Sequence, residues 1–257
     1  MSPTVVAVVA FCFSFGGALL GIWLATSVRW RPKAEDGTAK DTVKLAIGLV
    51  STMTALVLGL VTASAKNSYD QMDSAVKQAS INLLALDRAL ARYGPEAKDI
   101  RTQLKAVAEV RVDTIWPGSA PEQRGMARPA AGAPSTVEAL VDSIRSLAPG
   151  NELQSALKTR AVELAEDGLQ LRWLAMASAE TDVPVAFLVI VIFWLTVIFA
   201  SYGLYAPRSL AVMTALVVSS LSVACALFLV LELGSPFSGA IAVSDQPLLR
   251  ALALMNR

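Results

Sequence analysis

Four long apolar stretches constrain this chain more than any other feature. They cover residues 5–28, 43–65, 184–206 and 210–233, and none carries a charged side chain across its middle. Each reaches the length of about 20 residues that an α-helix needs to cross a bilayer core of roughly 30 Å. Lipid offers no hydrogen-bond partners, and the alternation typical of strands is missing, so these segments must be helices. The sequence therefore predicts an all-α membrane protein with four transmembrane helices.

The spans form two hairpins that flank a helical extramembrane domain. We expect the first transmembrane hairpin at residues 1–66, the domain at 67–183 and the second hairpin at 184–233. Inside the domain, residues 117–135 are rich in Pro, Gly and Ala, which predicts a linker. Residues 234–257 are broken by Gly234, Pro236, Gly239 and Pro247, so their apolar run is too short to span a bilayer, and they predict a turn followed by an interfacial helix. The apolar residues of this last helix are Leu248, Leu249, Leu252 and Leu254.

The helix of the second span continues without a break into the domain, up to the turn at Gly94-Pro95. Beyond the bilayer its apolar residues recur at alternating steps of three and four, as on the contact face of a coiled coil. We expect this seam to face a partner or an oligomer axis. A long later helix, capped by Asn151, is expected to run to about Glu180. The seam consists of Tyr69, Met72, Val76, Ala79, Leu83, Leu86, Leu90 and Tyr93.

Composition argues against several classes of function. The chain has no histidine, which removes the usual general base, proton relay and metal ligand. Phosphate-binding glycine loops, nucleophile–base sets and metal-spaced clusters are also missing, so we expect no enzyme, no metal and no cofactor. The net charge of +1 gives no basic signature for nucleic acid. Cys12 and Cys225 lie in apolar stretches, where cysteine behaves as a small hydrophobe.

The second span has two unlike faces. At about 100° per residue, small and hydroxyl-bearing side chains gather on one side, the small face, and bulky aliphatic side chains on the other, the large face. Small residues allow close packing against another helix, and hydroxyl groups can line a wet pore, so both explanations stay open. The small face comprises Gly48, Ser51, Thr52, Ala55, Gly59, Thr62, Ala63 and Lys66. The large face comprises Leu49, Met53, Leu56, Val57, Leu60 and Val61.

Two segments resemble elements of the bestrophins. Residues 59–70 are similar to the exit of their second transmembrane helix, through Lys66, Asn67 and Tyr69. Residues 232–239 look like the acidic–Pro–Phe–Gly element after their fourth span. The matching residues there are Glu232, Pro236, Phe237 and Gly239.

The likeness is closer to the bacterial bestrophin-like domain family. It covers about residues 43–254 and includes the Trp116-Pro117 pair that closes the second soluble helix, as well as Val243-Ser244. The resemblance implies a homo-oligomer in the lipid bilayer, by analogy a pentamer, that conducts inorganic anions. The alternative is a membrane-anchored interaction or sensing protein that binds its partner through the seam, without transport activity.

Some bestrophin features are not expected here. The resemblance places the bulky residues of the bestrophin pore neck at Ala55, Gly59 and Ala63, which are all small. A hydrophobic gate of that kind is therefore not predicted. Only Asp245 follows Phe237, so the calcium cluster of animal bestrophins has no counterpart. Lys66 either anchors the helix at the interface or, repeated around an oligomer, favours anions.

Two arguments about orientation in the bacterial inner membrane disagree. The loops that join the spans of each hairpin carry Arg29, Arg31, Lys33, Lys40 and Lys44 in the first and Arg208 in the second. The positive-inside rule places these loops in the cytoplasm and the domain at residues 67–183 in the periplasm. The bestrophin resemblance implies a cytosolic domain.

Overall fold

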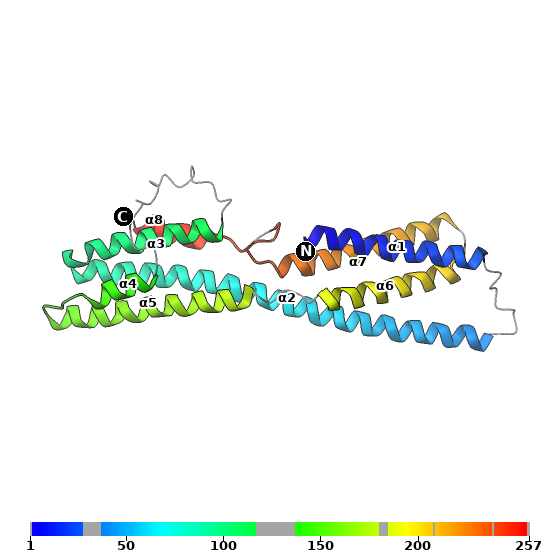
Figure 1. The fold of residues 1–257 in the computed structure, drawn as a ribbon, viewed down its shortest axis with the longest axis horizontal. Coiled ribbons are helices and arrows are strands. Elements are labelled where there is room, and N and C mark those ends of the chain that lie inside the picture. The colour runs from blue at the N-terminus through cyan, green and yellow to red at the C-terminus, as the bar shows by residue number, and fades with distance from the viewer. Residues whose placement is uncertain are drawn as a thin grey trace. The chain divides into compact units, whose positions relative to one another are not determined.

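The chain is almost entirely helical in the part that the structure describes (Figure 1). In this computed structural model the described residues are 2–27, 37–116, 137–179, 185–207, 209–237 and 239–255, with the side chains of 37–40 and 169–179 left out. Within these ranges there is no strand, which confirms the all-α prediction. The helices are α1 (Pro3–Ser27), α2 (Gly37–Tyr93), the short 3-10 turn η1 (Pro95–Ala97), α3 (Lys98–Ile115), α4 (Val137–Arg145), α5 (Glu152–Ala179), α6 (Val185–Tyr205), α7 (Leu210–Leu233) and α8 (Gln246–Met255).

Several sequence-based expectations concern residues outside this description. They are the linker at 117–135 and the basic loop residues Arg29, Arg31, Lys33 and Arg208, together with the side chain of Lys40.

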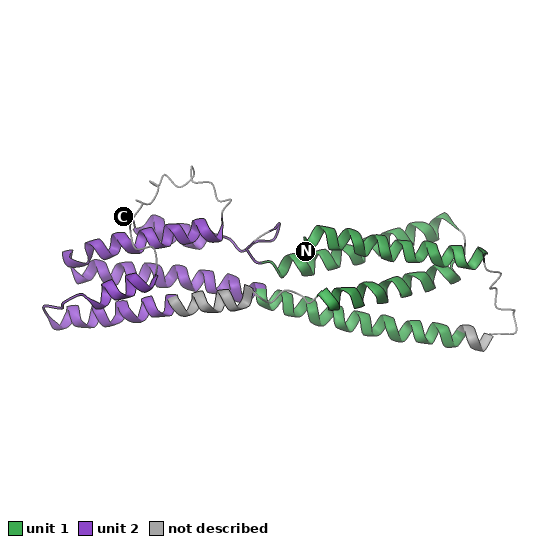
Figure 2. Ribbon diagram, viewed as in Figure 1, with its two compact units in different colours: residues 1–68, 182–235 green, residues 69–181, 236–257 purple. Residues whose placement is uncertain are grey.

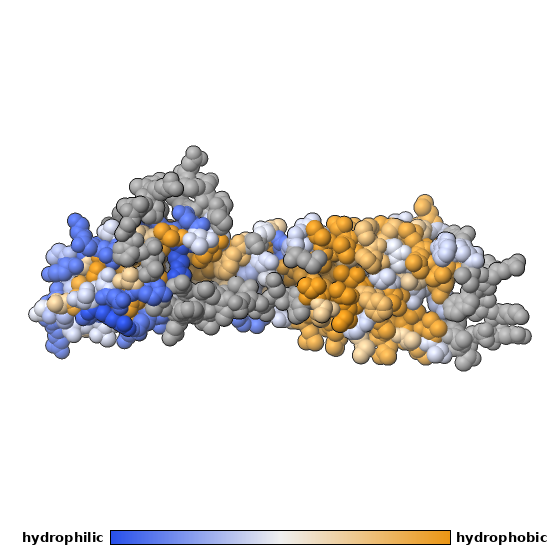
Figure 3. All heavy atoms as spheres, viewed as in Figure 1, coloured by the Kyte–Doolittle hydropathy of each residue, from blue (hydrophilic) through white to orange (hydrophobic). Residues whose placement is uncertain are grey.

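Four helices are long and apolar enough to cross a membrane: α1, α6, α7 and the part of α2 that begins at Asp41. The exposed surface of the segments that contain them is predominantly apolar (Figure 3). Large apolar side chains such as Trp23 and Phe193 are 61% and 62% exposed, which lipid tolerates and water does not. The predicted four-span membrane protein is therefore confirmed.

The chain divides into two compact units (Figure 2). Unit 1 contains Met1–Ser68 and Asp182–Ser235, and unit 2 contains Tyr69–Thr181 and Pro236–Arg257. Helix α2 contributes its first part to unit 1 and its remainder to unit 2. The core of each unit can therefore be considered by itself.

In unit 1, α1 packs along α6 and also along α7. Glycines bring the backbones of α1 and α6 together: a Cβ atom at Gly17 would lie 2.7 Å from the Thr196 carbonyl oxygen. A Cβ atom at Gly21 would overlap the carbonyl oxygen of Ala200, and one at Gly203 would overlap that of Ala18. Close backbone approach through small residues is thus the contact that joins the first and third spans.

In unit 2, the second half of α2 packs with α3, α4, α5 and α8 around one apolar core. The Asp87 carboxylate, 3% exposed, accepts two hydrogen bonds from Arg101 of α3, Nε to Oδ1 at 2.8 Å and Nη2 to Oδ2 at 3.1 Å. Asn151 caps α5 as predicted, since its Oδ1 accepts from the Gln154 backbone nitrogen at 2.8 Å. The Gln154 side chain in turn donates to the Tyr93 carbonyl at the end of α2. Polar caps and a bidentate ion pair thus fix the register of these helices.

The prediction that the seam on α2 faces a partner or an oligomer axis is wrong. Met72, Leu86 and Leu90 are 3%, 4% and 1% exposed and belong to the core of unit 2. The three-four spacing does mark a helix-packing face, but that face is covered by helices of the same chain. Spacing alone cannot distinguish an internal partner from an external one.

Helix α8 also differs from expectation. Leu248 and Leu252, predicted to face the membrane interface, are 9% and 1% exposed and lie in the core of unit 2. Only Leu254 keeps substantial exposure, at 40%. An amphipathic helix buries its apolar face against whatever apolar surface it reaches first, and here that surface is protein.

Candidate functional site

The membrane part of α2 is the least covered of the four spans. Only 6% of its most apolar stretch is buried, against 33% for α1 and 28% each for α6 and α7. A transmembrane helix with so little cover must meet lipid or another copy of the chain. This contrast makes α2 the natural candidate for a functional surface.

One narrow stripe of α2 does pack within unit 1. Thr54 and Ala65 are 3% and 7% exposed, and Leu58 packs against the cluster formed by Ala10, Val191 and Leu195. The Thr54 hydroxyl donates to the Val50 carbonyl at 2.7 Å, which satisfies this polar group inside the apolar contact. The stripe faces the other spans of its own chain and runs between the two predicted faces.

The small face is largely uncovered. Thr52, Ala55, Ala63 and Lys66 are exposed, as are the two glycines, whereas Ser51 and Thr62 are half-buried at its edge. A Cβ atom added at Gly48 or Gly59 would meet nothing within 4 Å. The small-residue packing that the sequence allowed on α2 is therefore not used inside the chain.

Hydroxyl groups on this face donate to the backbone of their own helix. Thr52 donates to the Gly48 carbonyl at 2.5 Å, and Thr62 donates to the Leu58 carbonyl at 2.7 Å. Such bonds occupy the hydroxyl hydrogen and leave the oxygen as an acceptor. Ser51 differs, because its Oγ is buried and has no hydrogen-bond partner among the described residues.

The large face is exposed as well. Leu49, Met53 and Leu60 are 63%, 54% and 64% exposed. The two faces flank the side of α2 that points away from its own unit. One chain leaves most of both faces uncovered, although Val57 of the large face packs against the cluster that contains Ala10, Val191 and Leu195. The chemistry of the two faces differs sharply.

The residues at the end of the second span fall into different environments. Lys66 and Asn67 are exposed in unit 1. Tyr69, the first residue of unit 2, packs against the apolar core of that unit. Glu232 is 4% exposed near the end of α7, and its backbone carbonyl accepts from the Ser235 nitrogen at 3.1 Å.

Two of the predicted C-terminal residues, Pro236 and Phe237, belong to a cluster around Trp116 in unit 2. The indole Nε1 of Trp116 donates to the Val243 carbonyl at 2.8 Å, and the Val243 nitrogen donates to the Pro236 carbonyl at 2.7 Å. Phe237 meets the Trp116 ring edge-on, with centroids 5.7 Å apart and planes at 83°. Gly239 has a φ of +96°, which favours glycine at this turn. This cluster joins the end of α3 to the C-terminal segment, and its geometry is structural.

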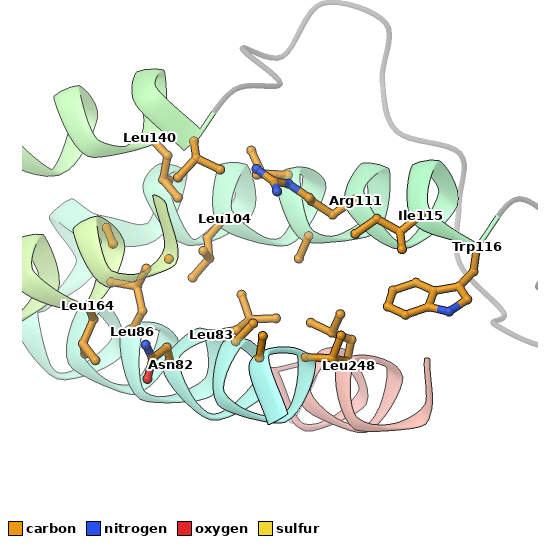
Figure 4. Close-up of a pocket in the computed structure, with 18 of the residues that line it drawn as sticks. Asn82, Leu83, Leu86, Leu104, Arg111, Ile115, Trp116, Leu140, Leu164 and Leu248 are labelled. Atoms are coloured by element: carbon orange, nitrogen blue, oxygen red, sulfur yellow. The ribbon is translucent and has the colours of Figure 1, made fainter. Parts of the chain in front are cut away.

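Sequence reasoning missed an apolar cavity of about 170 Å³ in unit 2 (Figure 4). Leu83, Leu86, Leu104 and Leu248 surround it, and Asn82 is a polar group at its wall. The cavity arises because small residues from three helices meet at this level of the bundle. They are Ala75 and Ala79 of α2, Ala108 of α3, and Ala165 and Gly168 of α5. On α5, Leu164 is followed one turn later by Gly168, and this change from a large to a small residue on one helix face was the signal that could have revealed the cavity.

Metal chemistry finds no support in the part of the chain that the structure describes. No group of three or more Cys, Asp or Glu side chains there could hold a metal ion. Cys12 and Cys225 are both free and exposed on their helices.

The sequence profile of the Bestrophin-like domain matches residues 12–248. The chain belongs to the bestrophin-like family. The fold is also similar to crystal structures of a bacterial bestrophin homologue from Klebsiella pneumoniae. One variant of that protein superposes with a TM-score of 0.64 at 16% identity over 97% of this chain and 98% of the other. A second variant gives 0.62 at 17% identity over 95% and 97%.

A structure of the same Klebsiella protein that was phased on zinc gives a TM-score of 0.61, at 17% identity over 95% of this chain and 97% of the other. At this level of identity the likeness establishes the fold of this bestrophin-like protein. No curated protein matches its sequence.

Proposed function

We propose that this bestrophin-like protein forms a homo-oligomeric anion channel in the bacterial inner membrane, with α2 lining the pore. The observation that carries the proposal is the uncovered small face of α2. Its glycines meet nothing within 4 Å, and the span around them is only 6% buried. In a symmetric ring of chains this face would point toward a shared axis. The other spans, α1, α6 and α7, would then lie outside, where lipid covers them. By analogy with the bestrophins, we propose that the ring is a pentamer.

The side chains on this face suit a water-filled path. Ala55, Gly59 and Ala63 follow one another at intervals of one turn and are all exposed. Because none of them is bulky, the proposed pore has no ring of large apolar side chains to exclude water along this stretch. The narrowest point must then come from another part of the path.

Lys66 supplies the proposed charge preference. It is exposed at the end of the small face, and each subunit of a ring would contribute one ammonium group at the same level. Such a ring raises the local concentration of anions and repels cations. The hydroxyls of Thr52 and Thr62 are engaged with backbone carbonyls, so we assign selectivity to the lysines first.

The alternative function, binding of a partner protein through the seam, lacks an available surface. It relied on the seam from Tyr69 to Tyr93, and that seam is occupied by the core of unit 2. We therefore propose a transport role and no catalytic role.

Planar-bilayer recordings of the purified protein test the proposal. Gly59→Leu places a bulky side chain on the small face, and we expect it to reduce the anion current several-fold. Gly16→Leu is the matched control, because a Cβ atom at this glycine of α1 also meets nothing within 4 Å. If both variants conduct like the parent, α2 does not line the path. A protein that shows no current in any lipid tested contradicts the channel proposal itself.

Orientation needs a separate experiment. A reporter fused at Ala131 should identify the side of the membrane that holds the extramembrane domain. The positive charge of the hairpin loops predicts activity in the periplasm. The family resemblance predicts activity in the cytosol.

A further inference from the structure

A second cavity lies within unit 1, between α2 and α6. Its volume is about 440 Å³, and it is found where the described side chains of α2 begin and where α6 ends. The two helices run in opposite directions, so these ends lie at the same side of the predicted bilayer. The lining residues are Lys44, Ile47, Gly48, Ser51, Ser201, Tyr202, Tyr205 and Ala206.

The cavity has an unsatisfied donor at its wall. The Ser51 Oγ is buried and has no hydrogen-bond partner among the described residues. Buried hydroxyls in folded proteins nearly always have a partner, and an exception calls for a specific explanation. Rotation of the Ser51 side chain would bring this hydroxyl into the cavity, where an acceptor group would satisfy it.

A cation and a phenol, those of Lys44 and Tyr202, line the same cavity. Lys44 lies 3.8 Å from Asp41, but the two side chains are 57% and 74% exposed, so the pair is weak and leaves the ammonium able to reach an anion. Tyr202 is 49% exposed, with its ring edge against Phe199. Gly48 leaves room between them, because a Cβ atom there would meet nothing within 4 Å.

We propose that this cavity binds the phosphate group of an anionic phospholipid. An ammonium group and neighbouring hydroxyl donors match the negatively charged oxygens of a phosphate. Tyrosine and lysine at the end of a span are also the residues that prefer the headgroup level of a membrane. Ser51 lies at the half-buried edge of the small face beside α6, apart from the proposed pore lining at Ala55, Gly59 and Ala63, so the site does not require that the protein conducts.

The surrounding surface favours a lipid over a free anion. On the bilayer side of the cavity, α6 exposes an apolar side chain one turn before Ser201: Val197 is 40% exposed. A ligand with a phosphate above acyl chains would therefore contact both the polar wall and the apolar surface below it. A soluble phosphate would use only the first.

Native mass spectrometry of the full-length protein in neutral detergent tests this site. Phosphatidylglycerol and phosphatidylcholine of matched chain length are added at equal concentration. We expect at least fivefold more bound phosphatidylglycerol on the parent protein. Lys44→Gln should abolish this preference, and Ser51→Leu, which fills the cavity, should reduce total binding. The control Lys77→Gln changes an exposed lysine of α2 in unit 2 and should leave binding unchanged.

Three results would overturn the proposal. Equal binding of both lipids on the parent protein shows that the cavity has no preference for an anionic headgroup. Displacement of the lipid by millimolar inorganic phosphate identifies the site as one for a soluble anion. A Lys44→Gln variant that changes its oligomeric state, while its lipid binding stays at the parent level, identifies the cavity as a contact between copies. Should Ser51→Leu fail to fold, Lys44→Gln alone decides.

Discussion

The indole Nε1 of Trp116 donates a hydrogen bond to the carbonyl oxygen of Val243, 127 residues further along the chain, at a distance of 2.8 Å. Both residues are buried, so the bond cannot be replaced by water without rearrangement. It links the last turn of α3 to the segment that leads into α8 and closes one end of the unit 2 core. The segments at Trp116 and Val243, which are far apart in the sequence, thus form one tertiary contact.

Trp116→Phe should destabilise unit 2 by about 1–3 kcal/mol, because the Val243 carbonyl would be left buried without its donor. Limited proteolysis, read by mass spectrometry, should show earlier cleavage in the segment after Pro236. Trp23→Phe is the control, since Trp23 is 61% exposed on α1. Equal effects of the two substitutions would contradict the role of the hydrogen bond.

Gly203→Ala should destabilise unit 1 by about 1–3 kcal/mol, the usual cost of overpacking. Its new Cβ atom would overlap the Ala18 carbonyl oxygen, so α1 and α6 must move apart. Gly16→Ala provides the comparison, because the Cβ atom there has open space. Thermal unfolding in detergent, followed by circular dichroism, measures both variants. A Gly203→Ala protein as stable as Gly16→Ala would show that the two helices are not in close contact.

The Asp87–Arg101 pair should respond asymmetrically to substitution. Arg101→Ala leaves a carboxylate that is 3% exposed without its partner, whereas Asp87→Ala leaves an arginine that is 36% exposed and can be hydrated. We expect Arg101→Ala to cost about 3 kcal/mol and Asp87→Ala clearly less. Chemical denaturation of both variants measures the difference. The reverse order would mean that Asp87 is hydrated in the native protein.

The same pair should be insensitive to pH over the usual range. Arg101 donates to the Asp87 carboxylate, and this hydrogen bond raises the pKa of Arg101 above its ordinary value. A raised pKa means that the stabilisation through Arg101 is complete at every pH below the ordinary pKa of the guanidinium group, and is lost only as the pH rises through the higher folded-state value. The stability difference between the parent and Arg101→Lys should therefore stay constant from about pH 6 to 9, since neither cation titrates there. A steady change across this interval would show that another group controls the pair.

Gly168→Ala should stabilise the protein by up to about 1 kcal/mol, because alanine is the better helix former and its Cβ atom meets nothing within 4 Å. Gly94→Ala is the opposite case, since Gly94 has a φ of +132° and alanine would be strained there. Melting temperatures of the two variants should shift in opposite directions. A destabilised Gly168→Ala would indicate that the cavity beside it is filled in the assembled protein.

Cysteine labelling in liposomes tests the environment of α2 without recording current. After Cys12 and Cys225 are replaced by serine, Ala55→Cys and Gly59→Cys should react with a membrane-impermeant thiol reagent. Leu20→Cys of α1, where leucine is 54% exposed on a membrane span, should stay unreactive. Protection of both α2 positions would place the small face in lipid or in a dry helix contact.

Most of the helical architecture could be predicted from the sequence. Long uncharged stretches identify the spans, and Gly94-Pro95 marks the end of α2 because proline cannot continue the preceding helix and Gly94 adopts a positive φ. Asn151 marks the start of α5 for an equally local reason, since its side chain bonds the first turn. These features depend on lipid solubility and on backbone hydrogen bonds within a few residues.

What the apolar and small faces of the helices pack against could not be predicted in the same way. The small residues of α2 were compatible with helix packing and with a pore lining, whereas Gly17, Gly21 and Gly203 form the close helix contact inside the chain. The seam was predicted to face a partner or an oligomer axis, and it packs in unit 2. The cavity beside Gly168 depends on three helices meeting at one level.

The sequence by itself determined the four spans, the ends of the long helices and the family, because hydropathy, caps and motifs are properties of single segments. Only the tertiary structure decided which faces are already covered: α1 against α6, the seam inside unit 2, and α2 left open within the membrane unit. The physical reason is that a helix periodicity specifies that one face must be shielded from water or from lipid. It carries no information on whether the shielding comes from the same chain, from another copy or from the bilayer.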